Sequence, residues 1–230
     1  MEEPRVGVII VAGGSGSRMG GAIPKQFALV GSEPILARTI NNFASAFASA
    51  KIVVVLPASH IDFWKNLAAR FRVASHTIVE GGKERFNSVK NGIEALSDAV
   101  DLIAVQDGVR PFASKAMIRK TAECAKANGA AIPVVTPVDS FRWADGDESK
   151  IINRDNLRIV QTPQIFEAGL LRAAYDTDFD ARFTDDASVV EAFGHKIALC
   201  EGERTNIKIT TPDDMIFAEA IIKAQKENDL

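Results

Sequence analysis

The segment from Val8 to Lys25 constrains the fold and function of this chain most strongly. It reads VIIVAGGSGSRMGGAIPK, an apolar run typical of a strand followed by a glycine-rich loop with two cations. Glycine lets backbone N–H groups approach a ligand closely, and open parallel sheets bind ligands at the carboxyl ends of their strands. Arg18 presents a planar fork to phosphate oxygens and Lys25 a mobile point charge. The segment therefore predicts a polyphosphate site; the alternative is a surface turn with two solvated cations.

Two better-known glycine motifs do not fit this loop. A P-loop requires Gly-Lys followed by Ser or Thr, a pattern that the loop lacks. A dinucleotide-binding loop requires Gly-x-Gly-x-x-Gly, but Met19 stands where the third glycine belongs. The next apolar run, Ile52 to Leu56, continues into Pro57 instead of an acid that could bind a ribose. A nicotinamide-dependent oxidoreductase is therefore a disfavoured alternative.

The composition favours a single soluble domain. The chain has 230 residues without an evident linker or repeat, so we expect one domain over residues 1–230. No apolar run approaches the roughly 18 residues of a membrane span, and the N-terminus does not resemble a signal peptide; we expect a cytoplasmic protein with no membrane partner. A formal charge of −3 disfavours nucleic acid as a partner. The two cysteines, Cys124 and Cys200, lack metal-ligand spacing and are expected to be ordinary buried thiols.

Apolar β-branched runs alternate with helix-periodic segments along the chain. This rhythm predicts a Rossmann-like α/β fold, a mostly parallel sheet with helices on both faces. The strands are expected near residues 6–11, 52–56, 77–79, 102–105, 131–135 and 196–200. Helix starts are predicted at Pro34 as a first helical residue, at a Ser59/Asp62 capping box, at Ser114 as a cap, and at Thr211-Pro212.

The rhythm breaks at about residues 137–157. Two short alternating segments flank the turn-rich sequence Ala144-Asp145-Gly146-Asp147, which predicts a β-hairpin arm inserted into the domain. Two isolated strands are marginally stable in water and cannot bury the large apolar side chains of this arm, which are Phe141, Trp143, Ile151 and Ile152. We therefore expect the arm to pack on a second subunit and to make the protein a homodimer.

Asp107 is the candidate metal ligand. It follows the apolar run Leu102 to Val105 in the sequence QDGVRP, at the carboxyl end of an expected central strand. Mg²⁺ prefers one or two carboxylates together with substrate phosphate oxygens, so Asp107 next to a triphosphate loop fits that ion or another divalent cation. Arg110 completes a tight turn beside it. The alternative is an aspartate that only stabilises the turn.

A double glycine precedes a predicted helix in EGGKERFNS. Gly82 would expose backbone N–H groups at the helix N-terminus to an anion or a base edge, and Ser88 would face the same cleft. The alternative is that Gly82 only turns the chain and that Ser88 is an ordinary helix hydroxyl. Further along, Arg154, Thr184 and Lys208 lack a recognised spacing, but a second phosphate-bearing substrate would need cations such as Arg154 and Lys208.

Several motifs in one order resemble the 2-C-methyl-D-erythritol 4-phosphate cytidylyltransferases of the non-mevalonate isoprenoid pathway. The resemblance covers nearly the whole chain and implies a nucleotidyltransferase type of fold. The reaction that it implies joins CTP and methylerythritol phosphate into CDP-methylerythritol and releases pyrophosphate, with Mg²⁺ bridging phosphates. The motifs are GGSGSRMG, PKQF, EGGKERFNSV, QDGVRPF, NRDNL, QTPQIF, TDDAS and NIKIT.

The resemblance also assigns roles to residues of this sequence. Arg18 and Lys25 match the pair that stabilises charge on the reacting phosphorus, and Asp107 matches the metal acid. Positions around cytidine are matched by Ala12, Gly13, Gly14, Gly82 and Ser88. Positions that hold the methylerythritol phosphate are matched by Arg110, Ser140, Arg154, Thr184 and Lys208, of which Arg154 and Lys208 aim it for attack. Because the family exchanges its arm across a dimer, Ser140 and Arg154 are expected to serve the neighbouring subunit's site.

The sequence departs from the family pattern in two places. QDGVRP replaces a His-Asp-Ala-Ala-Arg-Pro run, which predicts shifted backbone contacts near Gly108, and DSFR replaces Asp-Thr-x-Lys. Ribitol-5-phosphate cytidylyltransferases resemble the chain in several of the same motifs and are the main alternative. A non-catalytic nucleotide-binding module is a third possibility, disfavoured because Arg18, Lys25 and Asp107 are all present.

Overall fold

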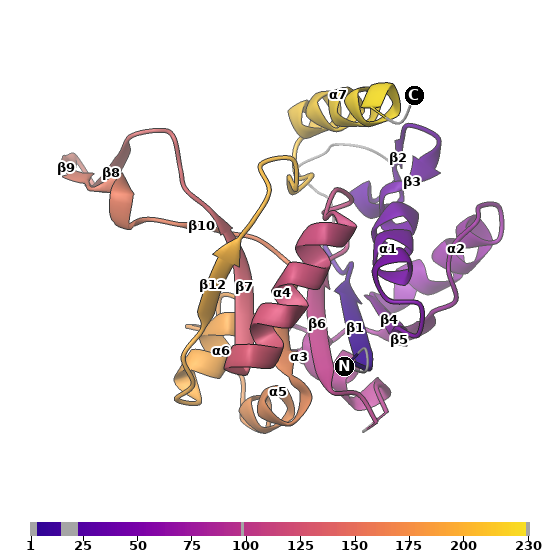
Figure 1. Cartoon of the computed structure of the whole chain (residues 1–230). Coiled ribbons are helices and arrows are strands. Elements are labelled where there is room, and N and C mark those ends of the chain that lie inside the picture. Colours follow the sequence, from indigo (N-terminus) through magenta and orange to yellow (C-terminus); the bar gives the residue numbers. More distant parts are fainter. Residues whose placement is uncertain (1–3, 15–22, 98, 229–230) are drawn as a thin grey trace.

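A twisted, mostly parallel sheet forms the centre of the computed structural model, which describes residues 4–14, 23–97 and 99–228 (Figure 1). Within them the strand order is β10-β7-β11-β6-β1-β4-β5, and β12 pairs with β7. The strands are β1 (Val6–Val11), β4 (Lys51–Leu56), β5 (Thr77–Glu80), β6 (Leu102–Asp107), β7 (Ala130–Val135), β10 (Ile159–Val160), β11 (Gln164–Glu167) and β12 (Ala198–Glu201). This architecture confirms the predicted fold class.

Strand β11 is the main element that the sequence analysis missed. It runs antiparallel between β6 and β7, and β10 is also antiparallel to β7. Their sequences, IV and QIFE, are too short to show the alternation from which strands are predicted. The other expected strands are present, most of them one or two residues longer or shifted.

Helices cover both faces of the sheet. The helices are α1 (Ile35–Ala46), α2 (Ala58–Ala68), α3 (Arg85–Ala95), α4 (Lys115–Asn128), α5 (Ala168–Ala174), α6 (Asp186–Ala192) and α7 (Pro212–Asn228). Successive side chains of a strand point to opposite faces. Accordingly, Val8 and Ile10 of β1 pack in the cluster with α1, α2 and α4, whereas Ile9 packs in the cluster with α3, α5 and α6.

Two predicted helix starts are wrong and two are confirmed. Pro34 is the N-cap of α1 rather than its first helical residue, and Ser59 lies inside α2, whose N-cap is Pro57. Both prolines already hold the extended backbone that an N-cap needs. Ser114 caps α4 by accepting a hydrogen bond from the Met117 N–H, and α7 begins at Pro212 as expected.

Helix α7 packs beyond the carboxyl end of the sheet in a third apolar cluster. In Figure 1 it lies above β2 (Leu29–Val30), β3 (Glu33–Pro34) and the N-terminal end of α4. Ala218 and Ile222 pack against Val30, Val109 and Ile209. This contact fixes the segment that leads into α7, and that segment carries Lys208.

The predicted arm is a two-stranded hairpin that projects far from the sheet (Figure 1). Its strands, β8 (Phe141–Asp145) and β9 (Glu148–Ile152), pair antiparallel with each other. The side chain of Trp143 is 47% exposed and that of Ile151 is 68% exposed. The hairpin is confirmed, and its packing on a second subunit stays a prediction.

The cysteines are less buried than predicted. Cys124 on α4 and Cys200 on β12 are half-buried free thiols, and burial raises the pKa of Cys200. No helix among the described residues is long and apolar enough to cross a membrane.

Candidate functional site

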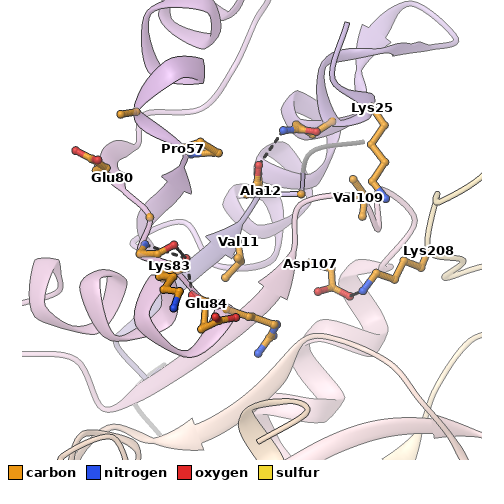
Figure 2. Close-up of a pocket in the computed structure, with 18 residues that line it drawn as sticks. Val11, Ala12, Lys25, Pro57, Glu80, Lys83, Glu84, Asp107, Val109 and Lys208 are labelled. Atoms are coloured by element: carbon orange, nitrogen blue, oxygen red, sulfur yellow. Dashed lines mark hydrogen bonds and ion pairs between the residues drawn. The ribbon is translucent and has the colours of Figure 1, made fainter. Parts of the chain in front are cut away.

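A cleft of about 540 Å³ opens at the carboxyl ends of β1, β4, β5 and β6 (Figure 2). Parallel strands bring these ends to one edge of the sheet, where ligands of open α/β sheets bind. The lining therefore gathers residues that are far apart in the sequence: Ala12, Gly13, Gly14, Lys25, Gly82, Arg85, Ser88, Asp107 and Lys208 among them.

The turn after β1 presents an open backbone edge to the cleft. Ala12 is fixed on both sides, because its N–H donates to the Val55 carbonyl at 2.9 Å and its own carbonyl accepts from Gln26 Nε2 at 2.9 Å. A Cβ built on Gly13 would meet no atom within 4 Å. The open space beside this rigid turn is what a phosphate group requires.

Lys25 lies in the cleft at the start of the 3-10 helix η2 (Lys25–Phe27) and is only 9% exposed. The Phe27 ring of the same short helix stacks on the buried Trp64 ring of α2, with centroids 5.8 Å apart. This packing holds the backbone that carries Lys25. Arg18, the predicted second cation, lies outside the described residues, as do Gly16 and Met19.

The turn after β5 is built around Gly82 and Ser88. The Gly82 N–H donates to Ser88 Oγ at 3.1 Å, and the Ser88 hydroxyl donates to the Glu84 carbonyl at 3.1 Å. A Cβ on Gly82 would lie 2.3 Å from that of Asn87, so glycine is required here. Ser88 thus holds the turn through its hydroxyl and also lines the cleft, and its contact with cytidine stays a prediction.

Asp107 is the last residue of β6 and anchors an ion-pair cluster. Its Oδ2 atom contacts Lys208 Nζ at 3.0 Å and Arg110 Nε at 3.3 Å. Burial pulls the pKa of the Asp107 carboxyl upward, but Lys208, Arg85 and Arg110 outweigh it, and the pKa lies below the ordinary value. Asp107 is therefore a carboxylate across the physiological range and orients two cations.

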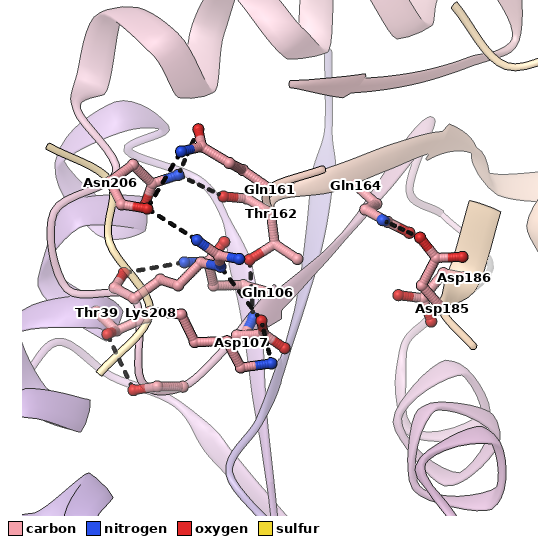
Figure 3. Close-up of polar contacts among 12 residues, drawn as sticks. Thr39, Gln106, Asp107, Gln161, Thr162, Gln164, Asp185, Asp186, Asn206 and Lys208 are labelled. Carbon is pink, nitrogen blue, oxygen red and sulfur yellow. Dashed lines mark hydrogen bonds and ion pairs between the residues drawn. The ribbon is translucent and has the colours of Figure 1, made fainter. Parts of the chain in front are cut away.

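A buried polar network holds this cluster in place (Figure 3). Asn206 Nδ2 donates to the Thr162 carbonyl at 2.9 Å, and the Asn206 backbone carbonyl accepts from Arg110 Nη1 at 2.8 Å. The Thr162 hydroxyl accepts from the Asp107 N–H at 3.1 Å. The network thus ties the end of β6 to the QTPQ turn and to the segment of Lys208.

The family model described as "2-C-methyl-D-erythritol 4-phosphate cytidylyltransferase" matches residues 6–224 of the chain. The chain belongs to this family. A protein of that name from Phocaeicola vulgatus is 47% identical over 216 residues, which cover 94% of this chain and 98% of the relative. The one from Bacteroides thetaiotaomicron is also 47% identical over 216 residues, with the same coverage.

Solved structures agree with this family assignment. The crystal structure of 2-C-methyl-D-erythritol 4-phosphate cytidylyltransferase from Thermus thermophilus is similar with a TM-score of 0.78 at 34% identity, and it covers 95% of this chain and 99% of that one. The structure titled 4-diphosphocytidyl-2C-methyl-D-erythritolsynthase from Anaerococcus prevotii has a TM-score of 0.80 at 30% identity, covering 96% of each chain. The fold of this cytidylyltransferase chain therefore matches that of family members along its length.

The turn at Gly108, for which the QDGVRP motif predicted shifted backbone contacts, is closely packed in this cytidylyltransferase. A Cβ on Gly108 would lie 2.8 Å from the Cβ of Ala12 and 3.2 Å from the Val11 carbonyl. The Gly108 N–H also donates to that carbonyl at 2.9 Å. The turns after β1 and β6 are thus closely packed, and an alanine at this position would require one of them to shift.

Four predicted site residues within the described part of the chain do not line the cleft: Arg110, Ser140, Arg154 and Thr184. Arg110 contacts the cleft residue Asp107, because its Nε atom lies 3.3 Å from Asp107 Oδ2. Ser140 and Arg154 belong to the arm, where Arg154 Nη1 donates to the Val138 carbonyl, and Arg154 begins the short helix η3 (Arg154–Asn156). Thr184 precedes α6 and its N–H donates to Ser188 Oγ at 3.0 Å. An arm that crosses to a second subunit is the arrangement the sequence analysis proposed for Ser140 and Arg154.

The cleft also contains residues that sequence reasoning did not single out. Pro57, Glu80, Lys83 and Arg85 line it, and Asn206 supports it through its hydrogen bond to the Thr162 carbonyl in the QTPQ motif. Arg85 and Asn206 lie within the motifs EGGKERFNSV and NIKIT, so their motif membership was the available signal. Arg85 contacts Asp186, which is 101 positions away, and Asn206 contacts Thr162, which is 44 positions away. No local sequence pattern predicts contacts over such separations.

The residues present fit a magnesium ion that arrives with a triphosphate. Among the described residues there is no cluster of three or more His, Cys, Asp or Glu side chains that could hold a metal, so they do not form an all-protein cage. Mg²⁺ is commonly held by one or two carboxylates and substrate phosphates. Asp107 provides one such carboxylate at the cleft.

Proposed function

We propose that this protein transfers CMP from CTP to 2-C-methyl-D-erythritol 4-phosphate, giving 4-diphosphocytidyl-2-C-methyl-D-erythritol and pyrophosphate. The family match over residues 6–224 carries the proposal. The names of the relatives favour methylerythritol phosphate over ribitol 5-phosphate. A transferase family also disfavours the non-catalytic module.

The nucleotide half of the cleft suits CTP. Backbone groups of Ala12, Gly13 and Gly14 would approach the triphosphate, and the turn of Gly82 and Ser88 would contact cytidine. Lys25, held by its packed short helix, would stabilise the negative charge that builds up on the α-phosphorus, together with Arg18. Fixed cations in a cleft act strongly because they need no reorganisation during the reaction.

The second substrate would enter beside Lys208 and Arg110. A phosphate monoester loses its second proton near pH 6, so it is already a nucleophile and requires no general base. Its oxygen attacks the α-phosphorus of CTP, and the bond from that phosphorus to the pyrophosphate oxygen breaks. Lys208 would orient this phosphate, with Arg154, Ser140 and Thr184 as further ligands.

Asp107 is the proposed protein ligand for magnesium. When bound with the phosphates, magnesium supplies charge neutralisation. Asp107 itself remains ionised and holds Lys208 and Arg110 through its Oδ2 atom.

We further propose a cytoplasmic homodimer in which the arm of each subunit completes the other's site. Trp143 and Ile151 support this because they are large apolar residues that their own chain leaves 47% and 68% exposed. Arg154 and Ser140 do not line the cleft of their own subunit, and in the dimer they would line the cleft of the other subunit.

Pyrophosphate release tests the function directly. The purified protein is assayed with CTP and Mg²⁺ and with either methylerythritol phosphate or ribitol 5-phosphate, and the product is identified by mass spectrometry. We expect release with methylerythritol phosphate at a much higher kcat/KM, and weak release when UTP or ATP replaces CTP. Preference for ribitol 5-phosphate would contradict the substrate assignment, and no release with either would contradict the activity.

A further inference from the structure

We propose that Arg85 is a positioning residue that couples the two halves of the site through its ion pair with Asp186. The inference rests on the proposed function, because it assigns one half to CTP and the other to the polyol phosphate. The family resemblance assigns no role to Arg85 or Asp186, and the contact between them is what the inference adds.

The ion pair is bidentate and buried at its acidic end. Arg85 Nη1 donates to Asp186 Oδ1 at 2.9 Å, and Nη2 donates to Oδ2 at 2.6 Å. The Asp186 side chain is 0% exposed. The Tyr175 hydroxyl donates to the same Oδ1 at 2.7 Å. A planar fork on a carboxylate fixes direction as well as distance.

Each end of the pair adjoins a turn assigned to a different substrate. Arg85 is the first residue of α3, lines the cleft and follows Gly82 by three positions. Asp186 is the first residue of α6 and follows Thr184 by two. The pair therefore joins the proposed cytidine turn to the proposed polyol phosphate turn across about 100 positions of sequence.

Apart from the ion pair with Arg85, the turn that carries Thr184 is fixed by hydrogen bonds of Asp185. Asp185 accepts a hydrogen bond from Gln164 Nε2 at 2.8 Å and caps α6 at the Ser188 N–H at 2.9 Å. These contacts fix it to β11 and to its own helix. The contact between Asp186 and Arg85 ties it to the nucleotide side.

The electrostatics favour a permanent ion pair. Burial lowers the pKa of Arg85, but Asp186 outweighs burial and the net pKa is raised. Burial, followed by the charge of Asp186, raises the pKa of Tyr175 well above its ordinary value. Both groups therefore keep their protons across physiological pH, and Arg85 also contributes attraction to Asp107.

Stability alone does not require this pair. A buried ion pair often contributes no more than well-packed apolar residues of similar size. The neighbouring residue Phe86 already joins the same elements, because its ring stacks on Tyr175 at 4.7 Å and on Phe183 at 5.6 Å between centroids. The aromatic contacts thus stabilise the packing between these elements, and the bidentate ion pair fixes the orientation of Arg85 relative to Asp186.

The test measures KM for the polyol phosphate that the wild type uses, KM for CTP, kcat and thermal unfolding. Arg85→Lys keeps the charge but loses the fork, and Tyr175→Phe removes only one donor. The paired variant Arg85→Met with Asp186→Leu removes both charges. Phe86→Leu on the same helix serves as the matched control, because it weakens the packing and leaves the ion pair.

We expect Arg85→Lys and the paired variant to raise KM for the polyol phosphate or lower kcat by about 10- to 100-fold, since small misplacements have effects of this size. KM for CTP should change by less than about threefold, and Tyr175→Phe should give a smaller effect of the same kind. Phe86→Leu should lower the unfolding temperature with wild-type kinetics.

A paired variant with wild-type kinetic constants would overturn the inference and leave the proposed function intact. The same holds if Arg85→Lys loses activity only in proportion to folded protein. Absence of turnover in the wild type with either polyol phosphate would remove the proposed function and this inference with it.

Discussion

The carboxyl end of the sheet, where the cleft opens, and the hairpin arm have opposite physical characters. At the sheet, Val8 to Ile10 are fully buried and the polar groups of Ala12 in the adjoining turn are satisfied within the chain. In the arm, two strands pair with each other and leave Trp143 and Ile151 exposed. The first region is packed by its own chain, whereas the second leaves large apolar side chains at the surface. A site that uses both would be rigid on one side and depend on assembly on the other.

Deletion of the hairpin arm should have the largest effect, because it leaves the sheet domain alone. Replacing residues 138–156 by a short Gly-Ser linker should give a folded monomer with no measurable turnover, because Arg154 and Ser140 are lost together. Sedimentation gives the oligomeric state, and circular dichroism verifies that the sheet domain is folded. An active monomer would contradict both the dimer and the shared site.

Lys25→Ala probes the sheet side alone. We expect kcat to fall about 100- to 1,000-fold, since removing one preorganised charge-stabilising group has costs of this order, while the Kd for CTP changes much less. Steady-state kinetics and calorimetric titration with CTP measure the two. Lys65→Ala, on the exposed face of α2, is the control. Turnover of Lys25→Ala at the wild-type rate would remove its proposed role.

Arg154→Ala probes the arm side without deleting it. Loss of a charged hydrogen bond costs about 1.5–3 kcal/mol, which corresponds to a rise in KM for the polyol phosphate of roughly 10- to 100-fold, with KM for CTP nearly unchanged. Initial rates at varied polyol phosphate measure the change, and Arg158→Ala, four residues further along, is the control. An equal rise in both KM values would argue against a substrate-specific contact.

Two glycine substitutions test different costs: Gly82→Ala tests close packing beside the cleft, and Gly146→Ala tests backbone strain in the arm. The first places a Cβ 2.3 Å from that of Asn87 and should lower the free energy of unfolding by about 1–3 kcal/mol. Gly146 has φ of 55° in the arm turn and open space around it, so alanine should cost only about 1–2 kcal/mol, confined to the hairpin. Urea unfolding of the sheet domain should therefore shift for Gly82→Ala and stay at the wild-type midpoint for Gly146→Ala, and a shifted midpoint for Gly146→Ala would contradict the independence of the arm.

The smallest effect is a pH dependence at Asp107. Its pKa is below its ordinary value of 3.8 in the folded state, so its stabilising contribution is fully present above about pH 4 and is lost as the pH falls through the lower folded pKa. The stability difference between the wild type and Asp107→Asn should therefore shrink below pH 4. Urea midpoints at pH 3 to 7 measure it; a difference independent of pH would contradict an ionised, paired Asp107.

The sequence predicted the sheet strands and the hairpin better than the connections between them. Val6 to Val11 and Leu102 to Val105 are long apolar runs whose burial on both faces leaves little choice of structure. Strand β11 escaped prediction because Gln164 to Glu167 is short and gains its pairing only from β6 and β7 on either side. The start of α2 was misplaced because its proline cap lacks the side-chain signal that favoured Ser59.

By itself, the sequence determined the family, the α/β fold class and the set of chemical groups, because motif order, periodicity and residue type are local properties. Only the tertiary structure decided which groups meet. It joined Asp107 to Lys208, tied Asn206 to Thr162 and placed Arg85 on Asp186. Such pairs depend on crossover geometry and on burial that strengthens a contact between charges, and both arise only when distant strand ends are brought to one edge of a sheet.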